Sequence, residues 1–184
     1  MDQIADAAQA FNAVNVVRKS SDGRLHGDML DGKAMLRALQ ARGIALRERS
    51  VFLTGCGGAG SAMAFSACAA GARTLRLMDI DAGRVSTLAA VLAQRFPACN
   101  VGIVQTPGAC DVQINATPLG MKLGDPLPIP LDQACPNLAA VDAVTSTGVT
   151  PWVASCRTRG IITVDGNELA AAQQPLLLEF FGFG

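Results

Sequence analysis

The chain has 184 residues, half of them apolar, and its 15 basic side chains balance its 15 acidic ones. This length allows one well-buried domain, and the neutral charge predicts a small-molecule partner rather than a nucleic acid or an anionic membrane. No apolar run reaches about 18 residues, and the first residues do not read as a secretion signal. We therefore expect a cytoplasmic protein that does not enter a membrane.

The first fifty residues differ in pattern from the rest. We predict a helix over residues 4–11, a strand over 13–19, a turn at 21–23 and a helix from about 31 to 42. These elements are too few to form a second domain.

After Ser50, short β-branched apolar runs alternate with alanine-rich helical stretches, a pattern typical of a parallel sheet covered by helices. We predict an α/β fold, namely a doubly wound (Rossmann) parallel sheet with helices on both faces. The expected strands are 51–54, 74–79, 101–104, 111–115, 138–144 and 161–165, and the expected helices are 59–70, 82–95 and 151–159. The last helix has Thr150 as its cap and Pro151 in its first turn.

The C-terminal stretch is unusually apolar. Pro175 should kink or restart a helix there, and it is followed by Leu176, Leu177, Leu178, Phe180, Phe181 and Phe183. Such a tail needs a covering surface, which is either the sheet of this chain or a second copy. A homodimer through these apolar ends is therefore one prediction.

A glycine-rich motif separates the first expected strand of the sheet from its helix. Gly55, Gly57 and Gly60 fit G-x-G-x-x-G, in which the glycines permit a tight turn, a close approach to a pyrophosphate and close helix packing. The phosphates would lie at the helix N-terminus, where free N–H groups attract anions. We predict a dinucleotide held by Gly55, Cys56, Gly57, Gly58, Ala59 and Gly60. The alternative is a tight turn without a ligand.

Asp79 ends the next expected strand and is placed to accept hydrogen bonds from the ribose hydroxyls of a dinucleotide. Its carboxylate would repel a 2′-phosphate, so we predict NAD in preference to NADP, although Arg84 keeps NADP as an alternative. Cys56, at the mouth of the helix, is either a thiol of lowered pKa or a small loop residue. We favour the second reading because no histidine or acid nearby would make it a nucleophile.

Two other kinds of site are less compatible with the sequence. The six cysteines include no C-x-x-C pair and the chain has one histidine, so we predict no metal site. The S-adenosylmethionine-dependent methyltransferases share this architecture, but their loop has glycines at alternate positions after an acid. Here Thr54 precedes the loop, and Ala59 takes the third alternate position.

Four further motifs extend the pattern: "AVN" at 13–15, "LHGDMLDG" at 25–32, "NATPLGM" at 115–121 and "DGNELAAAQ" at 165–173. With the glycine loop, their order and spacing resemble the shikimate dehydrogenases and their quinate dehydrogenase and dehydrogenase-like relatives. The resemblance covers essentially the whole chain and the later two thirds of that family's chain. It implies that residues 1–24 are a remnant of an N-terminal substrate domain, that 25–165 form the NAD(P)-binding domain, and that 166–184 form a C-terminal helix returning toward the substrate domain.

The resemblance also implies an activity, hydride transfer between a nicotinamide and a ring hydroxyl of shikimate, quinate or a related cyclic polyol acid. It implies that Asn15 and Gln173 bind the substrate and that Asp31 both binds it and forms half of a lysine–aspartate pair. Such a pair is needed because a carbon loses hydride only as its hydroxyl loses a proton. The cofactor side would include Asn115, Thr117, Ala143, Gly166 and Leu169.

The chain departs from the family pattern at several points. None of Lys19, Lys33 and Lys122 stands in a matching motif, so we expect this chain alone to bind the cofactor without the catalytic lysine. Met29 and Leu30 stand where typical members have Asn and Thr, and Thr145 stands where they have Tyr. These losses of polar groups favour a substrate other than shikimate. The family's "NRT" stretch is replaced by Asp79-Ile80-Asp81, which again favours NAD.

Simpler roles remain open for the three substrate-side residues. Asp31 is a suitable helix N-cap, Asn15 an ordinary edge-strand residue and Gln173 a solvated helix residue. The competing function is a non-catalytic NAD-binding module or a dimerising sensor.

Overall fold

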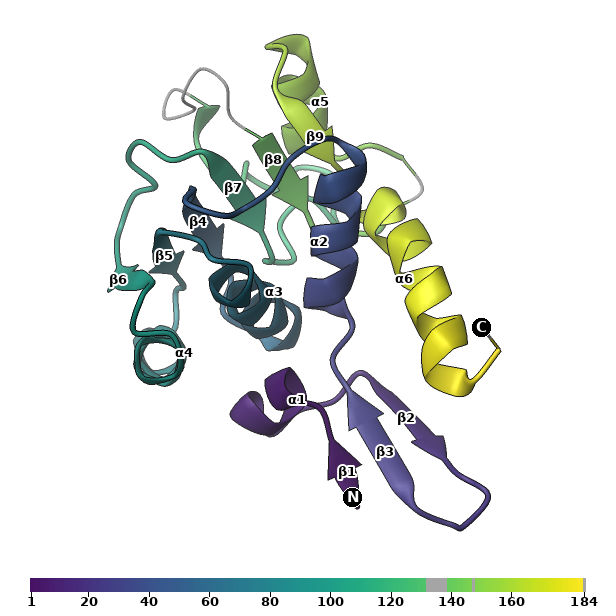
Figure 1. The fold of residues 1–184 in the computed structure, drawn as a ribbon. Helices are drawn as coiled ribbons and strands as arrows, with labels where there is room; N and C mark the ends of the chain where they lie inside the picture. The colour runs from purple at the N-terminus through teal and green to yellow at the C-terminus, as the bar shows by residue number, and fades with distance from the viewer. Residues whose placement is uncertain (132–138, 147, 184) are drawn as a thin grey trace.

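The computed structural model describes residues 1–131, 139–146 and 148–183. Its centre is a parallel sheet of six strands in the order β6-β5-β4-β7-β8-β9 (Figure 1). The strands are β4 Ser50–Thr54, β5 Thr74–Met78, β6 Asn100–Ile103, β7 Val112–Asn115, β8 Ala139–Asp142 and β9 Ile162–Val164. The predicted doubly wound parallel sheet is confirmed. Residue 138, where we expected β8 to begin, lies outside the described residues.

The central strands are apolar on both sides because helices cover both faces of the sheet. Val51 and Leu53 of β4 face a large core cluster that also contains Met35, Met63 and Leu169. These come from α2 (Asp31–Ala41), α3 (Gly58–Ala69) and α6 (Gly166–Phe181). The adjacent helix α4 (Ala82–Arg95) contributes Val85, Leu88 and Leu92 to the same cluster.

The opposite face has a smaller core cluster. Phe52 of β4 and Ala140 of β8 pack there with Trp152 and Val153 of α5 (Pro151–Thr158). As predicted, α5 begins after Thr150, whose hydroxyl accepts a hydrogen bond from the backbone N–H of Val153 at 3.3 Å.

The N-terminal segment forms a second, smaller sheet below the main one in Figure 1. It contains β1 Gln3–Ile4, β2 Val16–Lys19 and β3 Leu25–Asp28 in the order β1-β3-β2, with α1 (Asp6–Phe11) between its first two strands. We had not predicted β1 or β3, whose strand structure depends on cross-strand pairing. The small sheet extends to Asp28 and so includes residues that we had assigned to the Rossmann domain. The division into three parts remains a prediction.

Helix α6 runs back across the molecule and packs against α2 (Figure 1). Asp165 and Glu168 form a reciprocal capping box at its start. The prediction that Pro175 restarts this helix was wrong, because α6 continues through it to Phe181. The carbonyl that Pro175 leaves without an N–H partner belongs to Ala171, which is exposed and can bond to water.

The apolar tail is only partly covered. Leu176, Leu177 and Phe180 are half-buried, and the Arg18 guanidinium of β2 lies 5.7 Å from the centre of the Phe180 ring. By contrast, Leu178, Phe181 and Phe183 are 52%, 44% and 77% exposed. None of the helices in the described ranges combines the length and hydropathy that a bilayer span requires.

Candidate functional site

The glycine loop follows β4 at the point where the order of strands reverses. The chain runs from β4 to β5 and β6 on one side and then returns to β7 on the other side of β4, which creates a crevice at the carboxyl ends of β4 and β7. Gly55 has a φ of +90°, and a Cβ on it would lie 2.6 Å from the carbonyl carbon of Ala116. A Cβ on Gly60 would lie 1.8 Å from the Gly55 oxygen. Both positions therefore require glycine.

Gly57 and Gly58 border open space at the start of α3. A Cβ built on either residue would meet no atom within 4 Å, and Gly57 is the N-cap of α3. No side chain caps this helix, so the first N–H groups of α3 face the open side of the crevice. The N-terminus of α3 can thus receive an anionic group such as a pyrophosphate.

Asp79 lies directly after β5 beside this loop. One carboxylate oxygen accepts a hydrogen bond from the backbone N–H of Cys56 at 2.5 Å, and the other accepts one from Asp81 at 2.9 Å. The Asp79 side chain is only 5% exposed, and the Arg84 guanidinium lies 3.9 Å away. Asp79 therefore fixes the shape of the glycine loop, a role that the sequence did not reveal.

The structure decides between the two readings of Cys56. Burial, with the nearby Asp79 charge as a second cause, raises the pKa of the Cys56 thiol to about 12. The alternative that we did not favour, a lowered thiol pKa, is wrong, because the helix N-terminus does not compensate for burial beside a carboxylate. Cys56 contributes its backbone N–H and a small buried side chain to the loop.

Two more strand ends complete the crevice. Asn115, at the end of β7, is fully buried, and its side-chain oxygen accepts hydrogen bonds from the backbone N–H and hydroxyl of Thr117 at 3.0 and 2.6 Å. Ala143 follows β8 directly. These residues lie across the crevice from the glycine loop. The two sides of the crevice meet where Ala116 approaches Gly55.

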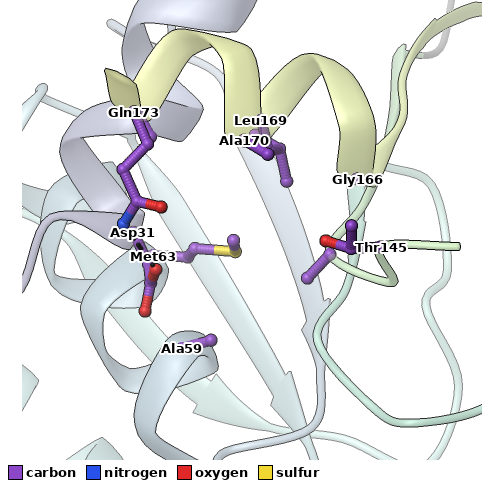
Figure 2. Close-up of a pocket in the computed structure, with 10 residues that line it drawn as sticks. Asp31, Ala59, Met63, Thr145, Gly166, Leu169, Ala170 and Gln173 are labelled. Carbon is purple, nitrogen blue, oxygen red and sulfur yellow. Dashed lines mark hydrogen bonds between the residues drawn. The ribbon is translucent and has the colours of Figure 1, made fainter. Parts of the chain in front are cut away.

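A pocket of about 90 Å³ lies beside the glycine loop, between α2, α3, α6 and the segment after β8. Figure 2 shows Asp31 and Gln173 on one side of it and Gly166 and Thr145 on the other. Its lining residues are Asp31, Ala34, Ala59, Met63, Ala143, Thr145, Gly166, Leu169, Ala170 and Gln173. Six of the predicted site residues, namely Asp31, Ala59, Ala143, Gly166, Leu169 and Gln173, are thus brought together from distant parts of the chain.

Asp31 is the ionisable residue of this pocket. It is the first residue of α2 and caps nothing, because the N-cap position is Leu30 and has no side-chain hydrogen bond. The simple capping role was therefore wrong. Instead, Asp31 accepts a hydrogen bond from the side-chain amide of Gln173 at 3.1 Å. Burial raises the pKa of the Asp31 carboxyl, and hydrogen bonds from Gln173 and Asn15 oppose that rise.

Asn15 joins this cluster from the loop before β2. Its side-chain oxygen accepts a hydrogen bond from the backbone N–H of Leu30 at 3.0 Å, and the side chain is exposed. Met29 and Leu30 are only 3% and 2% exposed and do not line the pocket. The polar side chains of the pocket are therefore those of Asp31, Gln173 and Thr145.

Sequence reasoning missed Ala34, Met63 and Ala170 as lining residues. Ala34 lies one helical turn after Asp31, and Gly166, Leu169, Ala170 and Gln173 share one face of α6 by their spacing. Helical periodicity would have found Ala34 and Ala170. Met63 carried no such signal, because α3 is buried on nearly all sides.

These residues fit a nicotinamide dinucleotide. The open space at Gly57 and Gly58 suits a pyrophosphate, and the pocket beside Ala143 and Gly166 suits a flat ring. A Cβ on Gly166 would lie 2.1 Å from the Val144 oxygen, so only glycine lets α6 begin this close to the end of β8. The six-stranded parallel sheet and the crevice at its strand order reversal are those of the Rossmann class.

Comparison with known proteins narrows this class. The chain is 35% identical over 174 residues to the shikimate dehydrogenase (NADP(+)) of Rubrobacter xylanophilus, a match that covers 91% of this chain and 61% of that enzyme. In structure it resembles the 5-ketofructose reductase of a Gluconobacter species, with a TM-score of 0.88 and 26% identity over 98% of this chain and 67% of that one. It also resembles a quinate dehydrogenase from Corynebacterium glutamicum in complex with NAD, with a TM-score of 0.83 and 25% identity over 94% and 64%. No family model matches the sequence.

In both sequence and structure the chain is therefore similar to shikimate and quinate dehydrogenases. It spans about 61% of the length of the curated relative described above.

Proposed function

We propose that this chain binds a nicotinamide dinucleotide in the crevice between β4 and β7 and takes part in hydride transfer from the carbon that bears a ring hydroxyl of a cyclic polyol acid, or back to the corresponding carbonyl carbon. The observation that carries this proposal is the shared pocket of Asp31, Gln173 and Gly166 beside the glycine loop. A polar substrate group at Asp31 and a nicotinamide ring at Ala143 would then occupy one continuous space.

The residues of the pocket have separable tasks in this reaction. When bound, the nicotinamide supplies or accepts the hydride. Asp31 holds or accepts the hydroxyl proton, which its raised pKa favours. Gln173 and Asn15 orient the carboxylate, and Met63 and Leu169 help keep the pocket apolar. Ala143 and Gly166 have no side chain beyond a methyl group and so leave room for the ring.

The Asp31 carboxylate is not paired with an ammonium group in the described structure. None of the ten residues that line the pocket is a lysine, and the Lys33 ammonium is instead 2.5 Å from Asp28. We therefore propose that proton transfer at Asp31 needs a lysine that is not among these lining residues.

We further propose that NAD is the preferred cofactor. Asp79 presents a carboxylate beside the glycine loop, and Asp81 adds a second one, so a 2′-phosphate would meet two negative charges. Arg84 contacts both carboxylates, which reduces the attraction it would exert on a phosphate. The curated relatives bear NADP(+) in their names, which makes this preference the sharpest point to test.

The experiment mixes the chain with NAD⁺ or NADP⁺ and with shikimate or quinate, and follows the absorbance of the reduced nicotinamide. A primary amine such as methylamine is then added as a substitute for the lysine. We expect cofactor binding without turnover in buffer alone, turnover when the amine is present, and none in an Asp31→Asn variant. Turnover without amine would contradict the proposed need for a further lysine, and absence of cofactor binding would refute the function itself.

The exposed apolar tail favours a second candidate, a cofactor-binding module that pairs with another copy. Leu178, Phe181 and Phe183 offer the contact surface. Sedimentation of the wild-type chain and of a Phe181→Ser, Phe183→Ser variant tests it. A dimer that dissociates in the variant supports this function, whereas a monomeric wild-type chain excludes it.

A further inference from the structure

Asp142, the last residue of β8, is a charged side chain for which the proposed function gives no task. It is fully buried, and its carboxylate is the acceptor of three hydrogen bonds. Oδ1 accepts from the side-chain amide of Asn115 at 2.9 Å and from the backbone N–H of Val144 at 3.1 Å, and Oδ2 accepts from the Thr150 hydroxyl at 2.6 Å. A buried carboxylate is costly, so it is tolerated only with such complete pairing.

The first of these hydrogen bonds leads to one wall of the crevice. The Asn115 amide nitrogen donates to Asp142 at 2.9 Å and to the Leu119 carbonyl at 3.3 Å, and its oxygen accepts both hydrogen bonds from Thr117. The Thr117 hydroxyl in turn accepts a hydrogen bond from the backbone N–H of Leu119 at 3.2 Å. The orientation of one amide thus sets the path of the loop after β7.

The second hydrogen bond leads to the segment that follows the neighbouring strand β8. Val144 is held through its backbone N–H, and its neighbours Ala143 and Thr145 line the pocket. The carbonyl of Val144 also limits how close α6 can begin, since it lies against Gly166. One carboxylate therefore fixes two segments that follow neighbouring strands, residues 115–119 at the crevice and residues 143–145 at the pocket.

We propose that Asp142 is a positioning residue that holds residues 115–119 and 143–145 in the geometry that receives the nicotinamide half of the cofactor. This inference rests on the proposed function. Asp142 acts through hydrogen-bond geometry, because it touches neither the pocket nor the substrate-side carboxylate Asp31.

The arrangement of donors suggests the decisive variants. In Asp142→Asn, the amide oxygen can still accept from Asn115 and Val144, while the amide nitrogen donates to the Thr150 hydroxyl oxygen. In Asp142→Ala, all three hydrogen bonds are lost. Thr150→Val is the matched control, because it removes the hydrogen bond to Asp142 and the α5 cap to Val153 but leaves the Asp142 links to Asn115 and Val144.

Two measurements on the full chain test the proposal, the dissociation constant for NADH and the hydrogen exchange of the Thr117 and Leu119 amides without cofactor. We expect Asp142→Asn and Thr150→Val to bind NADH within about threefold of wild type, and Asp142→Ala to bind at least about tenfold more weakly. The two amides should exchange faster in Asp142→Ala alone. If Asp142→Ala does not fold, Asp142→Ser, whose side chain is too short to reach Asn115, takes its place with the same expectation.

Wild-type affinity in a folded Asp142→Ala or Asp142→Ser protein would overturn the proposal. An equal loss of NADH affinity in Thr150→Val and Asp142→Ala would also overturn it, because the loss would then follow from a general decrease in stability. A loss of NADH affinity in Asp142→Asn as large as that in Asp142→Ala would contradict the proposal, because it would show that the charge of Asp142, and not its hydrogen-bond geometry, supports binding. If wild type binds no NADH, the proposed function fails, but the exchange of the two amides still decides whether Asp142 positions the loop.

Discussion

The side-chain amide of Gln173 donates a hydrogen bond to the carboxylate of Asp31 at 3.1 Å, although 142 residues separate them in the chain. This contact joins the first residue of α2 to the third turn of α6 and closes one side of the pocket. It also brings a partly buried acid and an amide together at the lining of the pocket.

The stability of the fold should depend on the charge of Asp31. Burial raises the pKa of Asp31 in the folded state, so folding favours the protonated form, and its contribution is lost as the pH rises through the folded pKa. Asp31→Asn removes this charge and should raise the melting temperature by a few degrees at neutral pH, with a smaller gain at low pH. Thermal unfolding of both proteins across pH 3 to about 8 measures this. A variant that is less stable at every pH would contradict it.

Substitution of two glycines of the loop should have two different effects, one on stability and one on cofactor binding. Gly60→Ala places a Cβ 1.8 Å from the Gly55 oxygen and should destabilise the fold by roughly 2–4 kcal/mol. Gly57→Ala meets no atom within 4 Å, so the fold should keep its stability while NADH binding weakens about tenfold. Denaturant unfolding and NADH titration of both variants separate the effects. Unchanged binding in Gly57→Ala would argue against a pyrophosphate at this position.

Cys56 should be a poor nucleophile in the folded protein. Its pKa rises from 9.0 to about 12, so the thiolate fraction at pH 8 should fall by about 10³-fold relative to an unperturbed thiol. Alkylation followed by peptide mass mapping should label Cys56 only after unfolding. Rapid labelling of Cys56 in the native protein would contradict the burial and the adjacent charge that the structure gives it.

The cofactor preference should respond to Asp81. Asp81→Asn keeps the N-cap of α4, where the side chain accepts a hydrogen bond from the Arg84 backbone N–H at 3.0 Å, but removes one of two charges that engage the Arg84 guanidinium. NADPH affinity should then rise about fivefold while NADH affinity stays unchanged. Arg84→Ala is the companion variant and should weaken NADPH only. An equal change for both cofactors would show that Asp81 has no part in recognising the 2′ position.

Local patterns predicted most of the fold, because the apolar runs after Ser50 are the strands of the parallel sheet and the alanine-rich stretches are helices. Helix α4 begins and ends at the predicted residues 82 and 95. Strand β3 was missed, since Gly27 and Asp28 are poor strand formers and the strand depends on its pairing with β2. The predicted restart of the helix at Pro175 was wrong, because solvent can bond to the one helical carbonyl that the proline leaves without an N–H partner.

The candidate site was predictable only in part. The motifs named Asp31, Gln173 and the glycines, and the structure places them beside one pocket and one crevice. The hydrogen bonds of Asp79 to the glycine loop and of Asp142 to Asn115 depend on which strands are neighbours in the sheet. No spacing along the chain carries that information.

The central claim is that the N-terminus of α3 and the strand ends beside it bind a nicotinamide dinucleotide. Calorimetric titration of NADH into the wild-type chain tests it most directly, with Gly57→Ala measured in parallel. We predict saturable heat for one site on the wild-type protein, and a dissociation constant about tenfold weaker for the variant. No heat with either NADH or NADPH, or equal heat for the two proteins, would contradict the account.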